Sequence, residues 1–448
     1  MAKTNTQQLP GSMVGTHAED AGEAAVVRKV FHRLMWFLFL ISAISYLDRI
    51  NISYAALSMN KTLGLTGTTY GLATTIFYVG YVICEVPSNV LLAKFGARMW
   101  LSRIMITWGI VSAATMFIYD ETSLYVMRFI LGVAEAGLTP GVLLFLTFWF
   151  PRKYRARATG YFIIALALAV VTGSMISGLI LKMPPYFGLE NWRWLFLIEG
   201  LPATFFGLFG LYYLSDNPQK ATWLTTSEKA ILQRAFDRDE AAAKSVEVAR
   251  SGSIWRQMLR KESVLLGLAY FGLVTTISAN SSWVPLIVKE LMSKYSISDV
   301  AFMTAIPPTI AILVLFAWGR SSDRTRERVW HTIAAFVVAA VGWMLVGYAA
   351  GPEIRFLGLV LCAIGAWCGM TIFWTLPPLL LPEQTRPTCI AFINSVGLLA
   401  SALTPSIIGI LRDRTGTFTI GVSYASIVLV IAIALILFVT GPKKATFG

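Results

Sequence analysis

Two ionisable residues, Arg128 and Glu135, lie inside a stretch that is otherwise apolar enough to cross a lipid bilayer, residues 127–150. A charged side chain at membrane depth costs roughly 2.5 to 3.5 kcal/mol, so such residues seldom face lipid. A separation of seven residues is about two helical turns, which puts both side chains on one stripe, roughly 10 Å apart along the axis. The spacing predicts that both face one cavity, where Arg128 holds an anion and Glu135 takes up a proton. The structural alternative is an ion-pair network between helices.

Asp48 and Arg49 are a second acid and base within an apolar stretch, two residues after Tyr46. Adjacent residues point about 100° apart on a helix, so both line one cavity only if the helix presents a broad face to it. The structural alternative is that they pair with Arg128 and Glu135 where two helices meet. The two arrangements are compatible, because such pairs can exchange partners when a protein changes conformation.

Other candidate residues carry polar groups without charge. Tyr78 lies in an early apolar stretch, where contact with a ligand and plain packing are both open. Thr371, Trp374 and Asn394 lie in later stretches, which hold essentially no charge from residue 264 onward. This asymmetry predicts that the first half of the chain binds a charged group and a proton, and that the second half recognises the body of the ligand. A further embedded acid, Glu199, has no role that the sequence assigns.

The composition is that of an integral membrane protein. Hydrophobic residues make up 56% of the 448 residues and charged residues only 14%, which lies outside the range of soluble domains. About twelve apolar runs approach the ~20 residues that a helix needs to cross a lipid bilayer, so we expect an all-α protein. The spans are expected at 34–57, 70–93, 99–119, 123–149, 156–182, 194–214, 264–288, 300–319, 330–350, 355–381, 388–411 and 418–440.

The net charge of +13 would suit a nucleic-acid partner, but the positions of the basic residues argue against one. Most of the 37 lysines and arginines fall in loops on the side shared with both termini, which is the distribution found in cytoplasmic loops. Both termini are therefore expected in the cytoplasm, and the protein in a bacterial-type inner membrane. The first 27 residues contain no apolar run, so no cleaved signal peptide is expected.

Histidines and cysteines form no catalytic or metal-binding pattern. The three histidines lie in the tail or near expected helix ends, without the spacing of a nucleophile and base or of metal ligands. The four cysteines fall within or at the ends of expected helices, which argues against disulfides. We therefore expect neither an enzyme nor a metal or other cofactor. A channel is disfavoured because the polar groups are single rather than repeated in rings.

The apolar runs fall into two sets separated by a polar segment of mixed charge. We expect a cytoplasmic tail at 1–33, a six-helix bundle at 34–214, a cytoplasmic linker at 215–263, a second six-helix bundle at 264–440 and a cytoplasmic tail at 441–448. A long central linker of this kind is typical of transporters whose two halves move against each other.

Several motifs resemble those of the major facilitator superfamily. The segment GRSSDRTRER, residues 319–328, is similar to its loop signature, although the earlier counterpart, SNVLLAKFGAR, has Ala93 in place of the acid. The segments SYLDRINIS, EVPSN, RFILGVAEAG, WRWLFLIEGLP and FINSVG resemble the anion:cation symporters of that superfamily, and the similarity covers nearly the whole chain. Within that group the sequence is most similar to permeases for tartrate, phthalate and 4-hydroxyphenylacetate.

The resemblance implies the major facilitator fold and the import of a small organic carboxylate, which is aromatic, tartrate-like or a sugar acid, together with protons by alternating access. We expect the protein to function as a monomer. The resemblance implies that Asp48 and Glu135 bind protons and that Arg128 and Arg49 handle the carboxylate. It also implies a pocket lined by Tyr46, Tyr78, Thr371, Trp374 and Asn394, with Asp323 and Arg324 of the loop signature acting in gating. The alternative is an exporter or antiporter of organic anions or drugs on the same fold.

Residues 163–171, IIALALAVV, depart from the sugar-acid members of this group, which carry a polar amide in the same helix. A polyhydroxylated substrate would lose a hydrogen-bond partner there, and each unpaired buried hydroxyl costs roughly 1 to 3 kcal/mol. The sequence therefore favours a less hydroxylated, aromatic carboxylate. The alternative is that this face of the helix contacts lipid or a neighbouring helix.

Overall fold

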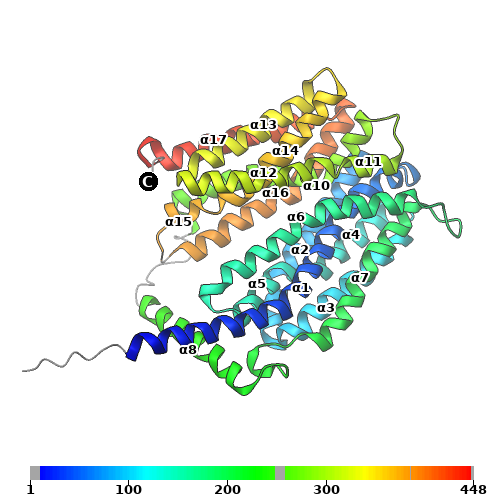
Figure 1. The fold of residues 1–448 in the computed structure, drawn as a ribbon. Coiled ribbons are helices and arrows are strands. Elements are labelled where there is room, and N and C mark those ends of the chain that lie inside the picture. The colour runs from blue at the N-terminus through cyan, green and yellow to red at the C-terminus, as the bar shows by residue number, and fades with distance from the viewer. Residues whose placement is uncertain (1–10, 248–257, 384, 445–448) are drawn as a thin grey trace, which may run out of the picture.

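The computed structural model describes residues 11–247, 258–383 and 385–444, and the regular secondary structure of these residues is helical. Among them, twelve helical spans are long and apolar enough to cross a membrane. The prediction of an all-α membrane protein with twelve spans is therefore confirmed. Figure 1 shows the helices arranged in two layers, one for each half of the chain.

The first six spans consist of α1 (Gly11–Thr62), α2 (Gly67–Phe95), α3 (Ala97–Ala114), α4 (Glu121–Glu135) with α5 (Leu138–Trp149), α6 (Arg152–Lys182) and α7 (Asn191–Tyr213). The last six consist of α10 (Lys261–Leu291), α11 (Ile297–Met303) with α12 (Ile306–Thr325), α13 (Val329–Tyr348), α14 (Pro352–Phe373) with α15 (Leu376–Leu380), α16 (Arg386–Thr415) and α17 (Thr419–Lys444). In the described part of the polar segment between the two sets lie a 3-10 helix, η2 (Pro218–Lys220), and the helix α8 (Thr226–Glu247).

The linker helix α8 is attached to the beginning of α1. Lys29 Nζ lies 2.8 Å from Glu228 Oε1, and Arg238 forms an ion pair with Glu23. Residues 11–33, which we expected in the N-terminal tail, thus form the first turns of α1. They give the linker a helical surface on which to pack.

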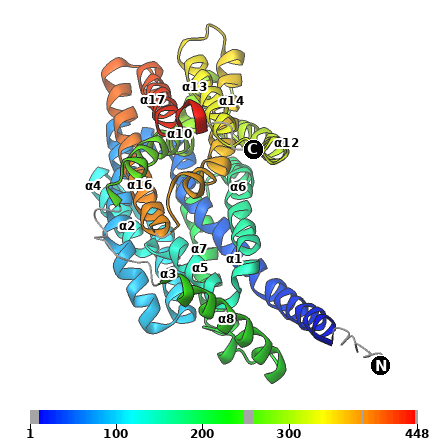
Figure 2. The same cartoon turned by 90° about the vertical axis from the view of Figure 1, so that its left-hand side faces the viewer.

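Each set of six spans packs mainly within itself. In the first set α3 lies against α7, α2 against α4 and α1 against α6; in the second set α13 lies against α14 and α17, and α10 against α16. The two sets meet mainly where α2 lies against α16, α1 against α10 and α6 against α11; α6 also contacts α12, and α1 also contacts α11. Figure 2 shows α16 beside α2 from a second direction.

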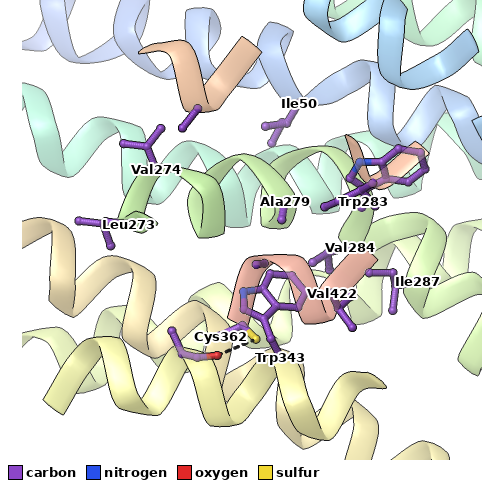
Figure 3. Packing of buried hydrophobic residues seen from close by; sticks show 14 of the residues in the cluster. Ile50, Leu273, Val274, Ala279, Trp283, Val284, Ile287, Trp343, Cys362 and Val422 are labelled. Carbon is purple, nitrogen blue, oxygen red and sulfur yellow. Dashed lines mark hydrogen bonds between the residues drawn. The ribbon is translucent and has the colours of Figure 1, made fainter. Parts of the chain in front are cut away.

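The two halves share one hydrophobic core. This core contains Ile50 and Tyr70 from the first half together with Trp283 and Trp343 from the second. Figure 3 shows part of this core. Ile50 of α1 and a short segment of α16, which is cut off in this view, lie on the same side of α10. Its members in the first half lie near the place where α1 ends and α2 begins. A second core is formed by residues of the first half together with the start of α1 and the linker, between residues 26 and 232.

We call the end of the molecule where α1 begins and α17 ends the terminal end, and the opposite end the far end (Figure 1). The halves are joined at the far end. Asp413 of α16 accepts hydrogen bonds from the backbone N–H groups of Gly67, at 2.9 Å, and Thr68, at 2.6 Å, in the first turn of α2. The Gly409 backbone approaches Gly67 so closely that a methyl group would not fit between them. The far end is therefore closed.

Candidate functional site

The fourth span is broken at the point where Glu135 lies. α4 ends at Glu135, and Gly137 adopts the left-handed conformation, with φ of 88°, before α5 begins. A side chain at Gly137 would collide with the hydroxyl of Ser88 in α2, so the positive φ and the close approach both require glycine. We expected one continuous helix over 123–149. Gly137 followed by Pro140 is the sequence signal that marks the break.

The buried carboxylate of Glu135 is held by two side chains of α1. Ser45 Oγ donates to Glu135 Oε1 at 2.9 Å, and Arg49 Nε donates to the same oxygen at 2.7 Å. The second oxygen, Oε2, has no hydrogen-bond partner among the described residues. The Arg49 guanidinium also lies over the ring of Tyr81, 5.0 Å from its centroid. Arg49 therefore fixes the position of Glu135 and is itself held by an aromatic face.

Asp48 is buried on the side of α1 that faces α3. Its Oδ2 accepts a hydrogen bond from Trp108 Nε1 at 3.0 Å. Its Oδ1 accepts from Asn51 Nδ2, also at 3.0 Å, and from the hydroxyl of Ser112. All three donors are neutral, so this carboxyl group is surrounded by hydrogen-bond donors rather than by a direct counter-charge.

Arg128 is only 1% exposed and lies in the middle of α4. Its guanidinium carbon is 4.7 Å from the centroid of the Phe77 ring. Two of its nitrogens, Nε and Nη1, have no hydrogen-bond partner within the described part of the chain. A buried guanidinium with free donors is costly unless an anion satisfies it. The fork geometry of arginine suits a carboxylate, which can accept two parallel hydrogen bonds.

A cavity of about 180 Å³ lies between the two halves, and the side chains of Arg49 and Arg128 both line it. Three predicted pocket residues also line this cavity: Tyr46 and Tyr78 from the first half and Asn394 from the second. The two acids do not line it. We expected acids and arginines to share one chamber. The structure instead places the arginines at the cavity wall, with Glu135 behind Arg49 and Asp48 turned toward α3.

A second cavity, of about 730 Å³, adjoins the first and is mainly apolar. The two cavities share Tyr46, Ile50, Ile277, Ser281 and Met370. The larger cavity is lined by the remaining two predicted pocket residues. Thr371 lies in α14, and Trp374 lies directly after the end of that helix. Thr371 Oγ1 donates to the backbone oxygen of Trp367 at 3.0 Å, so its hydroxyl hydrogen is already used.

The apolar segment 163–171 of α6 faces the larger cavity through Leu166, Ala167 and Val170. This face of the segment therefore borders the cavity and not only lipid or a neighbouring helix. Hydroxyl groups of a ligand would find no hydrogen-bond partner in these three side chains.

Tyr270 of α10 is one of the cavity residues that were not predicted. It lines the smaller cavity, and its ring centroid lies 5.1 Å from that of Phe373 and 4.8 Å from that of Trp374. A tyrosine in an apolar run is equally compatible with packing, so the sequence contains no local signal for its role. Its contacts place it at the junction of α10 with the end of α14.

Asp323 and Arg324, the predicted gating residues, lie in the last turns of α12, away from both cavities. Asp323 Oδ1 is 2.7 Å from Arg328 Nη2, an ion pair within the same loop region. The Asp323 side chain is 71% exposed. In this conformation the ion pair between Asp323 and Arg328 thus stabilises the turn between α12 and α13.

The sequence was compared with families and with known proteins. A family model described as "Major Facilitator Superfamily" matches residues 38–405. A protein of Agrobacterium vitis named "Putative tartrate transporter" is 40% identical over 423 residues, covering 94% of this chain and 93% of that protein. A "Quinolone resistance transporter" of Acinetobacter baumannii is 34% identical, covering 92% of this chain and 94% of that protein.

The arrangement of helices also matches a solved structure. The crystal structure of a bacterial homologue of the human lysosomal transporter Spinster, in an inward-facing and unoccupied conformation, superposes with a TM-score of 0.74 at 17% sequence identity. The match covers 94% of this chain and 99% of that one. At this identity the likeness concerns the fold alone.

Proposed function

Because this chain belongs to the Major Facilitator Superfamily, it is a multi-pass membrane transporter, and we propose that it imports a small organic carboxylate together with protons. As a member of this superfamily it is not an enzyme and needs no cofactor. The substrate, the coupling ion and the direction of transport are the proposed parts.

The observation that carries the proposal is the state of Arg128. Its guanidinium is buried, lines the cavity and has two nitrogens without a hydrogen-bond partner among the described residues. A carboxylate entering the cavity would accept these hydrogen bonds and compensate the charge. The nearby phenol of Tyr78 and amide of Asn394 offer further polar contacts from opposite halves.

Proton coupling is supported by the position of Arg49, which donates a hydrogen bond to Glu135 and also lines the cavity. While Glu135 is ionised, it holds the guanidinium by an ion pair. Protonation of Glu135 removes that partner, so Arg49 becomes available to an anion in the cavity. Proton and anion binding then favour each other, and by linkage the effect is reciprocal.

Asp48 is proposed as a second proton-binding residue of the same unit. Arg128 interacts electrostatically with Asp48 without forming an ion pair with it. Ionised Asp48 therefore offsets part of the positive charge of Arg128. Protonation of Asp48 would leave more positive potential at the cavity. The N–H groups of Trp108 and Asn51 can only donate and favour the ionised form, whereas the Ser112 hydroxyl can also turn to accept a hydrogen bond from the protonated form.

The larger cavity supports a substrate with an apolar, aromatic body rather than a polyhydroxylated one. Its wall includes Leu166, Ala167 and Val170, and Trp374 offers an aromatic face. Each hydroxyl buried there without a partner would cost about 1 to 3 kcal/mol. The name of the Agrobacterium relative refers to tartrate. We propose that this chain prefers an aromatic carboxylate, with its charged group at Arg128 and its ring in the larger cavity.

We propose that the halves at 34–214 and 264–440 rock against each other as bodies joined by the linker at 215–263, in a monomer. The basic loops favour cytoplasmic termini in a bacterial inner membrane. With that orientation the far end, closed by Asp413 on α2, is the outer side. The structure then corresponds to a conformation closed to the outside.

An exporter or antiporter of organic anions or drugs is the second candidate. The apolar cavity and the similarity to a "Quinolone resistance transporter" favour it. Right-side-out and inside-out vesicles with an imposed pH gradient separate the two candidates. Import by symport predicts accumulation of the anion in right-side-out vesicles with acid outside, whereas drug–proton antiport predicts uptake into acid-loaded inside-out vesicles and no uptake driven by acid outside.

A binding experiment tests the substrate class. Thermal unfolding of the purified protein would be followed with benzoate-type carboxylates, with tartrate and with the amides of the same aromatic compounds. Bound ligand raises the unfolding temperature by mass action. We expect stabilisation by aromatic carboxylates and little by tartrate or by the uncharged amides. Equal stabilisation by acid and amide would contradict a carboxylate site at Arg128.

A further inference from the structure

A buried acid outside the cavity, Glu199, lacks a counter-charge. It lies in α7 and is 3% exposed. Ser177 Oγ of α6 donates to Glu199 Oε1 at 2.7 Å, and Oε2 has no hydrogen-bond partner in the part of the chain that the structure describes. Among the described residues no ion pair involves Glu199. An ionised carboxylate in this position would be uncompensated within the membrane span, which costs several kcal/mol.

The surroundings of Glu199 connect it to the residues of the proposed proton pathway. The next residue, Gly200, packs so tightly on α3 that a methyl group would lie 3.0 Å from Ser112 Oγ. That hydroxyl is the one that donates to Asp48. The titratable side chains that face Glu199 are Asp48 and Tyr54, both of α1, while α3 and α6 present serines.

A chain of hydroxyl groups leads from Glu199 toward the contact between the halves. Ser177 and Ser174 are one turn apart on α6, and Ser174 Oγ lies 2.5 Å from the hydroxyl of Tyr54. Thr304 Oγ1, in the break between α11 and α12 of the other half, donates to the same Tyr54 hydroxyl at 3.2 Å. Tyr54 and Thr304 both line the larger cavity.

We propose that Glu199 is a further proton-binding residue, protonated while the halves are closed at the far end and deprotonated when α6 separates from α11. In the closed conformation the packed hydroxyl groups exclude water, so the neutral acid is the stable form. Separation of the halves breaks the contact between Tyr54 and Thr304 and lets water reach Ser174. Because the far end is the outer side in the proposed orientation, Glu199 then exchanges its proton with water on the outer side, and it must be protonated again before the halves close. This inference rests on the proton coupling proposed above.

Infrared spectroscopy of the purified protein tests the protonation itself, without transport. A protonated carboxyl group has a C=O band that an ionised one lacks. We expect a band that is absent in Glu199→Gln, is retained in Glu190→Gln at the exposed start of α7, and disappears from the wild type as the pH is raised. Failure to find it, or its persistence at every pH at which the protein stays folded, would overturn the proposal. Persistence would indicate a permanently neutral, structural acid.

A transport measurement tests the role in the cycle. The ratio of protons to substrate would be obtained from the reversal potential in proteoliposomes. We expect Glu199→Gln, which mimics the protonated acid, to keep the wild-type ratio and to reduce the slowing of substrate exchange at high outer pH; a lowered ratio, or a pH dependence equal to that of the wild type, would overturn the role. If the wild type shows no proton coupling at all, the proposed function fails, and the infrared result still decides whether Glu199 exchanges a proton.

Discussion

Arg49 donates its Nε–H to Glu135 Oε1 at 2.7 Å while its side chain also lines the cavity between the two halves. One guanidinium therefore contacts an internal acid and the space in which an anion would bind. The two partners compete for it, and a proton on Glu135 decides the competition in favour of the anion. This relationship couples the two ligands without requiring the acid itself to touch the substrate.

The first prediction concerns Glu135→Gln, which mimics the protonated acid permanently. We expect loss of proton-driven accumulation, because the variant cannot exchange a proton, while exchange of labelled for unlabelled substrate continues. Uptake into proteoliposomes with and without a pH gradient measures both activities. Glu121→Gln, an exposed acid at the start of the same helix, is the matched control. Full uphill uptake by the Glu135 variant would remove this residue from the proton pathway.

The second prediction concerns Arg128→Lys. Lysine keeps the positive charge and loses the planar fork that can hold both carboxylate oxygens. Loss of one hydrogen bond to a charged group costs about 1.5 to 3 kcal/mol, so the substrate Kd should rise about 10- to 100-fold. Isothermal titration with the best carboxylate of the thermal screen measures it, with the exposed Arg98→Lys as the control. An unchanged Kd would show that Arg128 does not hold the carboxylate.

Arg128 and Arg49 show what the sequence could predict of the site. A charged residue in an apolar run must face protein or water, whatever its neighbours are. The twelve spans follow from length and composition in the same way. The direction of Asp48 could not be predicted, because residues 48 and 49 point about 100° apart and the sequence does not say which of them faces the cavity.

The third prediction concerns the apolar wall of the larger cavity. Leu166→Asn introduces an amide of the same branched shape beside Ala167 and Val170, whose side chains have no polar group to offer. We expect weaker binding of aromatic carboxylates and stronger binding of hydroxylated ones such as tartrate, since the amide can pair with their hydroxyl groups. The ratio of the two Kd values measures the change. Leu179→Asn, on an exposed part of the same helix, should leave that ratio unaltered; an equal effect of both variants would place Leu166 outside the substrate site.

The fourth prediction concerns the closed far end, where Asp413 of one half accepts hydrogen bonds from the first turn of α2 in the other. Such an acid also interacts favourably with the positive end of the helix dipole. Removal of a side chain that caps a helix costs about 0.5 to 2 kcal/mol, and here the cost falls only on the conformation in which the halves touch. Asp413→Ala should therefore shift the equilibrium toward the conformation open at the far end by about 2- to 30-fold. Distances between spin labels at Lys61 and Arg414 measure the two populations. Asp299→Ala removes a cap within the second half and should not shift them; a distance distribution unchanged by Asp413→Ala would mean that other contacts hold the far end closed.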